Sequence, residues 1–165
     1  MAGGTRSAHT DEFWRSFREA AGLQHDDYDV VAFGDGAEMA TELAELTVAG
    51  TKRATAGLVR QFGPEKEAPP VLGGHVVLVD GEGRPRAIWR TTEIRFGPLN
   101  SVDERFAWDE GEGDRTRDWW LSAHRRFFAR HAAAQGFAMH DAIETMFERF
   151  EVVWPPEIAD RKPAV

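Results

Sequence analysis

Apolar residues recur at helical spacing in four stretches of the chain, and each stretch predicts a helix. The predicted helices span residues 11–21, 37–49, 102–108 and 116–135. Thr10 is a suitable N-cap for the first helix, and Ser101 with Glu104 matches a capping box at the start of the third. A glycine follows three of the helices, as is common beyond a helix C-terminus: Gly22, Gly50 and Gly136.

Segments rich in β-branched and aromatic residues lie between these helices and predict strands at 28–33, 75–79, 87–96 and 144–154. The turn residues 80–83 join the second and third strands, which predicts an antiparallel hairpin. This hairpin and the helix–loop–strand order around Gly50 predict an α+β fold, a barrel of mainly antiparallel strands. We expect the 116–135 helix to pack on it through Trp120 and Phe127.

Composition narrows the class of protein. A chain of 165 residues favours one domain, and the absence of Cys excludes disulfides, thiolate zinc sites and a cysteine nucleophile. No apolar run reaches the roughly 18–20 residues that span a bilayer, and the N-terminus has no apolar signal segment. We therefore expect a cytoplasmic protein without a membrane partner.

The net charge of -8 argues against a protein that coats nucleic acid through a basic surface. The local charge is uneven, because residues 103–114 hold six acidic side chains and one basic side chain, whereas 115–130 hold five basic and one acidic. The second segment offers three arginines for phosphates, although a solvated helix face explains them equally well: Arg125, Arg126 and Arg130.

The segment Gly50–Gly57 concentrates cationic and hydroxyl side chains directly after a helix. Two interpretations stay open from the residues alone: a binding loop, or a helix end whose dipole is complemented by Lys52 and Arg53. The acidic run 109–114 is likewise either a functional loop or a solvated turn that favours the following helix. It lacks the spacing of a calcium loop, so we expect no metal site.

The G-x-K-x-x-T run of Gly50, Lys52 and Thr55 between a helix and a strand resembles the signature of the ASCH (activating-signal-cointegrator homology) family. The resemblance continues to Trp154 through the segments that follow: Phe106–Trp108, the acidic loop, Trp119-Trp120 with His124, and Phe150–Val153. It implies a small PUA-like β-barrel with helices outside, which binds RNA. Some bacterial members are hydrolases of RNA or of acetylated cytidine.

The hydrolase members imply catalytic roles for Lys52 and Thr55, together with Glu112 or Glu110; the spacing to Trp119 favours Glu112. Thr55 would attack or orient water, Lys52 would accept a proton or stabilise the anion, and Glu112 would carry a proton. No cofactor is expected. This chemistry requires Lys52 to lie in a cleft beside a carboxylate.

The expected RNA contacts come from Thr51, Arg53 and Trp108, with the three arginines named above. We expect His124 and His131 to pack in the core. The chain is expected to divide into an N-terminal segment 1–36, the barrel domain 37–154 and a flexible tail 155–165.

Three hypotheses remain: a metal-independent hydrolase acting on single-stranded RNA or a modified nucleoside, a non-catalytic RNA-binding module, and a regulatory protein that contacts a partner through 125–130. No obligate protein partner is expected. As a loop residue, Lys52 is expected to contribute little to stability, so Lys52→Ala would stay folded.

Overall fold

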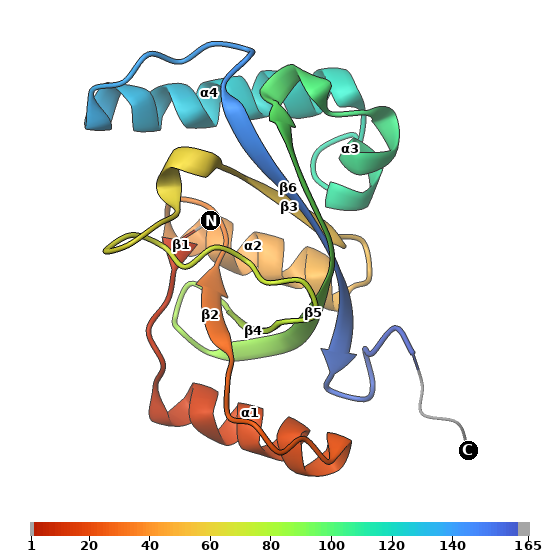
Figure 1. The fold of residues 1–165 in the computed structure, drawn as a ribbon. Helices are drawn as coiled ribbons and strands as arrows, with labels where there is room; N and C mark the ends of the chain where they lie inside the picture. The colour runs from red at the N-terminus through yellow and green to blue at the C-terminus, as the bar shows by residue number, and fades with distance from the viewer. Residues whose placement is uncertain (1, 162–165) are drawn as a thin grey trace.

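The computed structural model describes residues 2–161 and contains one curled, mixed sheet with helices around it (Figure 1). The strand order is β1-β2-β4-β5-β6-β3. β2 and β4 pair in parallel, and all other neighbours are antiparallel. The strands are β1 (Ala2–Gly3), β2 (Asp29–Ala32), β3 (Ala54–Leu58), β4 (His75–Val79), β5 (Pro85–Pro98) and β6 (Glu144–Trp154).

These strands confirm the α+β class and the mainly antiparallel sheet. The hairpin of β4 and β5 is also confirmed. The sheet is an open half-barrel rather than a closed barrel, because its edge strands β1 and β3 do not pair with each other.

The four predicted helices are present; α2 starts at the predicted residue, and the starts of the other three are shifted by one to three residues. They are α1 (Ala8–Ala21), α2 (Ala37–Val48), α3 (Glu104–Glu110) and α4 (Arg117–Gln135), and two short 3-10 turns lie at Val59–Gln61 and Leu99–Ser101.

Two predicted caps were wrong. Ser7 caps α1, and Thr10 is the N3 partner in its capping box. Asp103 caps α3 by accepting a hydrogen bond from the Phe106 N–H. The Ser101 hydroxyl donates instead to the Pro98 carbonyl, so α3 starts later and extends into the acidic run.

The core lies between the sheet and the helices. α4 packs on β3 and β6 through Trp120 and Phe128, which contact a cluster around Phe147. Phe127 is only partly buried beside that cluster. In a second cluster, Phe33 and Phe150 stack on the Trp89 ring at centroid distances of 5.6 Å and 4.3 Å.

The pairing of β3 with β6 determines where the segment after α2 lies. Residues 54–58 pair with 145–149, and the Arg53 N–H donates to the carbonyl of Asp109 at the end of α3. The loop 51–53 is thereby held between the C-terminal strand and the acidic loop.

Residues 155–161 belong to the tail that was expected to be flexible, and in the structure they contact the sheet. The Asp160 carboxylate accepts hydrogen bonds from the Arg53 side chain and from the Val152 N–H, and Ile158 packs on the core. The rest of the expected tail, 162–165, lies outside the described residues. In the described part of the chain, no helix is both long and apolar enough to cross a membrane.

Candidate functional site

Lys52 reaches from the loop between α2 and β3 into the protein interior. Its Nζ lies 2.9 Å from Glu112 Oε2 and 3.3 Å from Glu110 Oε1, and it also donates to the Glu110 carbonyl at 3.4 Å. The Lys52 and Glu110 side chains are 1% and 2% exposed, and that of Glu112 is 17% exposed. The lysine is therefore in a cleft beside two carboxylates.

Two glycines bring the acidic loop to Lys52. Gly111 ends α3 at a φ of 73°, and a Cβ there would lie 2.5 Å from the Thr51 carbonyl oxygen. Gly113, at a φ of 56°, lies so close under the Trp119 ring that a Cβ would overlap it. Both positions need a left-handed backbone and the absence of a side chain. Glu112 is thus fixed between two contact points.

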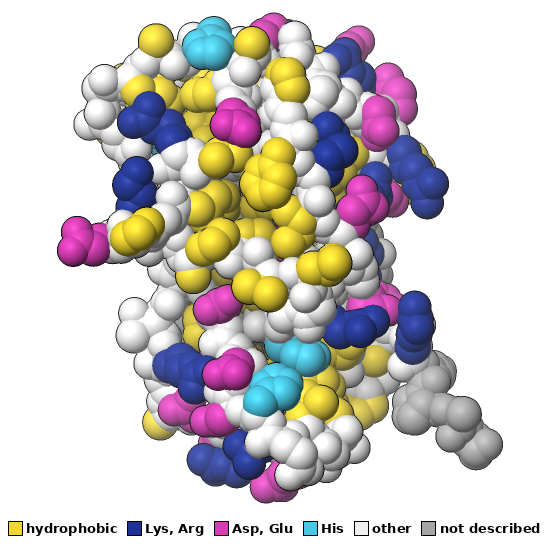
Figure 2. All heavy atoms as spheres, in the orientation of Figure 1, with side chains coloured by type: hydrophobic (Ala, Val, Ile, Leu, Met, Phe, Trp, Pro, Cys, Tyr) yellow, Lys and Arg dark blue, Asp and Glu magenta, His cyan; other side chains and the backbone are white. Residues whose placement is uncertain are grey.

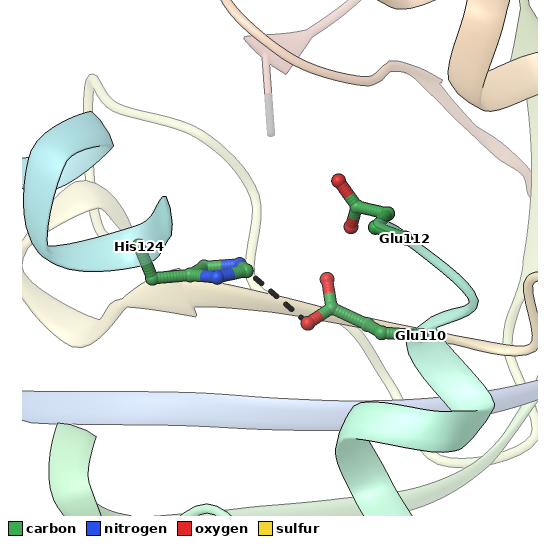
Figure 3. A group of neighbouring side chains, drawn as sticks. All are labelled: Glu110, Glu112 and His124. Carbon is green, nitrogen blue, oxygen red and sulfur yellow. Dashed lines mark ion pairs between the residues drawn. The ribbon is translucent and has the colours of Figure 1, made fainter. Parts of the chain in front are cut away.

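His124 completes the cluster from α4. Figure 3 shows its ring extending toward the Glu110 carboxyl, with Glu112 nearby on the loop after α3; Nε2 lies 3.5 Å from Glu110 Oε2. The ring stacks on Trp120 at 3.7 Å, and Nδ1 contacts the Trp120 carbonyl at 2.8 Å. We call these four residues the ionic cluster: Lys52, Glu110, Glu112 and His124.

The carboxylates decide the charge of Lys52. Burial acts to lower its pKa, but Glu112 and Glu110 outweigh burial and raise the pKa above its ordinary value. Burial would raise the pKa of Glu110, but Lys52 and His124 lower it to about 2. Lys52 is therefore an ammonium ion at neutral pH, so the expected alternative of a proton-accepting lysine is not supported.

The other two members are better suited to carry protons. Burial raises the pKa of Glu112 despite the attraction of Lys52. The pKa of His124 is raised because Glu110 outweighs the burial of the ring. The upward shift brings the protonation of Glu112 closer to neutral pH, and the upward shift of the His124 pKa favours its protonated form.

Glu110, Glu112 and His124 also form a possible metal-ligand set, since their ligand atoms lie within 4.8 Å of one another. The Lys52 ammonium already contacts both carboxylates. A divalent cation would have to displace it against charge repulsion. The residues therefore do not favour a resident metal ion.

The ionic cluster lines a cavity of ≈ 250 Å³, which we call the Lys52 cavity. Thr55 on β3 is also in its wall, so the structure brings all four predicted catalytic residues together. The Thr55 hydroxyl has no hydrogen-bond partner among the described residues. Aromatic and cationic side chains complete the lining: Phe33, Trp119, Phe127, Arg126 and Arg130.

The predicted RNA-contacting residues separate into two groups. Arg126 and Arg130 line the cavity, where Arg130 pairs with Asp35 at 3.1 Å. The other four lie outside its lining. Arg53 is bound to Asp160 and to two backbone carbonyls, Arg125 pairs with Asp141, Trp108 stacks under Arg115, and Thr51 packs on Gly111.

Sequence reasoning assigned His124 to the core and missed its contact with Glu110. The available signal was a histidine on an apolar helix face shortly after an acidic loop. Without the position of α3, that pattern is also typical of an ordinary core histidine.

The family model for the ASCH domain matches residues 29–154. Among solved structures, the ASCH domain from Lactobacillus crispatus JV V101 is similar with a TM-score of 0.83 and 27% identity, covering 90% of this chain and 96% of that one. A protein from Enterococcus faecalis V583 is similar with a TM-score of 0.80 and 34% identity, covering 88% of each chain. No curated protein matches the sequence.

Proposed function

The chain belongs to the ASCH domain family, and from this membership we propose that the Lys52 cavity binds a nucleoside unit and hydrolyses an acyl group from it without a metal ion. The observation that supports catalysis is the position of Lys52, because a binding module needs only an exposed cation, whereas this ammonium is buried against Glu110 and Glu112. An acetylated cytidine, free or in single-stranded RNA, is the substrate class that we favour.

The size of the cavity supports a single nucleoside. At ≈ 250 Å³ it lies just below the range of about 300–1,000 Å³ that is usual for small-molecule sites. Trp119 and Phe127 offer aromatic faces for a base, and Arg126 and Arg130 offer charge for a neighbouring phosphate. The phosphodiester of RNA is the second candidate substrate, favoured by these two arginines.

The proposed reaction assigns one role to each group. Ionised Glu112 takes a proton from water or from the Thr55 hydroxyl as its oxygen attacks the amide carbonyl, and then gives the proton to the leaving amine. If Thr55 attacks, the acyl group is left as an ester on its oxygen, and water activated by Glu112 then hydrolyses this ester, which releases the carboxylic acid and restores the hydroxyl. Lys52 stabilises the oxyanion, which replaces its two longer bonds to Glu110. Glu110 and His124 hold Lys52 and Glu112 in position.

The test is turnover of N4-acetylcytidine, and of labelled single-stranded RNA, followed by chromatography of the products. Glu112→Gln keeps the shape and the bond to Lys52 but cannot carry the proton, so the rate should fall about 10²–10⁴-fold. In Thr55→Val, the rate should fall by a similar factor if the Thr55 hydroxyl attacks the substrate, and by a smaller factor if the hydroxyl only orients water. Arg125→Gln is the matched control, because Arg125 lies outside the cavity, and its rate of turnover should equal that of the wild type.

The binding-only hypothesis predicts a different result. If the wild-type protein turns over neither substrate class but loses RNA affinity in the Arg126→Gln variant, the hydrolase proposal is wrong and the binding module stands. A metal chelator should leave the rate unchanged, and loss of activity on chelation would contradict the role given to Lys52.

A further inference from the structure

A second cavity of ≈ 310 Å³ lies between β2, β5, β6 and the loop after the first 3-10 turn. It shares no lining residue with the Lys52 cavity. Phe33 lines one cavity and Trp89 lines the other, and their rings stack nearly parallel, at an angle of 9°. We call this second space the Glu148 cavity, after the carboxyl that it contains.

Two buried polar groups line the Glu148 cavity without a full set of partners. Glu148 is 1% exposed, and its Oε1 accepts a hydrogen bond of 2.7 Å from the Thr91 hydroxyl. Trp89 is fully buried, and its Nε1–H makes no hydrogen bond of normal geometry with the described residues, although it lies close enough to the Glu148 carboxyl to act on it. A buried donor without a partner costs free energy, so this pair of groups is suited to a ligand.

The environment of Glu148 favours a carboxyl that is either protonated or accepts hydrogen bonds from donors. Burial raises its pKa to about 7, although the Thr91 hydroxyl and the nearby Trp89 indole act against that rise. The Glu148 cavity therefore contains the Trp89 indole N–H as a donor beside the Glu148 carboxyl.

The rest of the lining is mainly acidic and apolar. Asp29 and Glu67 stand against one cation, Lys66, whose Nζ is bound to the Arg60 carbonyl. Phe62 adds an aromatic ring. On the face drawn in Figures 1 and 2, the loop 62–72 crosses the front of the molecule and hydrophobic side chains gather over the same region. The excess of acidic side chains in the lining disfavours phosphate. Together with the aromatic rings, it favours an uncharged planar ligand.

We propose that the Glu148 cavity binds the base of an uncharged nucleoside that carries an amino group beside a ring acceptor. The amino group donates to the Glu148 carboxyl, and the ring acceptor accepts from the adjacent Trp89 N–H, which otherwise has only its long contact with that carboxyl. Adenine, cytosine and guanine offer both groups on one edge, whereas uracil has no amino group. The site is separate from the proposed hydrolysis and does not depend on it.

The test follows the Trp89 indole N–H signal in ¹⁵N-labelled protein, assigned sequentially and by its absence in the Trp89→Phe spectrum. Cytidine should move the signal saturably, and uridine should bind about tenfold more weakly. Glu148→Gln should weaken cytidine binding about tenfold, because an amide N–H₂ then faces the amino group of the base. Cytidine 5′-monophosphate should bind more weakly than cytidine.

Glu112→Gln separates the two sites, because it changes only the Lys52 cavity. The Trp89 signal should respond to cytidine in this variant as in the wild type, even when turnover is lost. The proposal is overturned if no nucleoside moves the signal, if uridine binds as tightly as cytidine, or if Glu148→Gln has no effect on the affinity.

Discussion

At the scale of single residues, the charge of Lys52 is balanced almost completely inside the protein. Removing the Lys52 side chain leaves the buried Glu110 carboxylate with His124 as its remaining ion-pair partner among the described residues. Breaking a buried ion pair by removing one partner costs about 3–5 kcal/mol. Lys52→Ala should therefore lower the free energy of unfolding by an amount of that order, as measured by urea denaturation.

This prediction is the opposite of the expectation from sequence, in which a loop lysine contributes little to the free energy of unfolding. Lys66→Ala is the control, since that lysine lies on an exposed loop, and its effect should stay within about 0.5 kcal/mol. Equal and small effects of both variants would show that Lys52 is not held as an ion pair. Loss of activity in Lys52→Ala alone is consequently a poor test of catalysis.

Glu148 predicts a pH dependence of stability. Its folded pKa of about 7 lies above the ordinary glutamate value of 4.5, so the folded state holds the proton more tightly than the unfolded state. The contribution is present below pH 4.5 and is lost as the pH rises to 7, a total of about 3 kcal/mol. Glu148→Gln should remove this loss, which urea unfolding at pH 5 and pH 8 measures in both proteins.

The chemistry of the site was predictable from sequence only in part. The spacing of Gly50, Lys52 and Thr55 identified the loop, and the acidic run supplied both glutamates. The burial of Lys52 was not predictable, because it depends on α3 lying beside a loop some sixty residues earlier in the chain. The contact of His124 with Glu110 has the same origin.

At the scale of elements, helical periodicity predicted all four helices, and β-branched and aromatic content predicted β2, β4, β5 and β6. No range was predicted for β1 (Ala2–Gly3) or β3 (Ala54–Leu58). The end of β6 at Trp154 and the end of α4 at Gln135 were confirmed. The predicted caps of α1 and α3 were wrong, because several neighbouring polar residues can cap a helix; Ser7 and Asp103 do so through local hydrogen bonds to the N–H groups of Thr10 and Phe106.

The Asp160 carboxylate helps to hold the segment after β6, together with the packing of Ile158 on the core. Asp160 accepts from Arg53 and from the Val152 N–H, and it ties the end of the chain to the loop that carries Lys52. Asp160→Ala should lower the free energy of unfolding by about 1–2 kcal/mol, because hydrogen bonds to a partly exposed charged group are lost. Asp141→Ala, which removes the exposed pair with Arg125, should cost less than about 1 kcal/mol.

The acidic loop depends on Gly113. A methyl group there would overlap the Trp119 ring and would also be strained at a φ of 56°. Gly113→Ala should shift Trp119 and Glu112. The rate of nucleoside turnover should therefore fall strongly, whereas the free energy of unfolding should change less. Gly83→Ala, at a positive φ but with no atom near the added methyl, is the control for backbone strain alone.

At the scale of the whole molecule, a net charge of -8 disfavours broad contact with nucleic acid, so we expect RNA to bind only near the Lys52 cavity, which Arg126 and Arg130 line. Only a single strand can place an unpaired base in that cavity. We expect modest binding to single-stranded RNA, with log affinity falling by about 0.7 per log salt for each phosphate contacted. Titration of labelled single-stranded and duplex RNA at two salt concentrations checks this, and equal affinity for both forms would contradict it.

The pairing of β3 with β6 has a consequence for how the protein is made. β3 leaves the ribosome long before β6, yet its neighbour in the sheet is β6, at residues 145–149. A contact between such distant segments closes a large loop and forms slowly. The ionic cluster needs β3 in place to position Lys52, so a nascent chain holds all four residues of the cluster before the cluster can form. We therefore expect nucleoside turnover to begin only after β6 has been synthesised and has paired with β3.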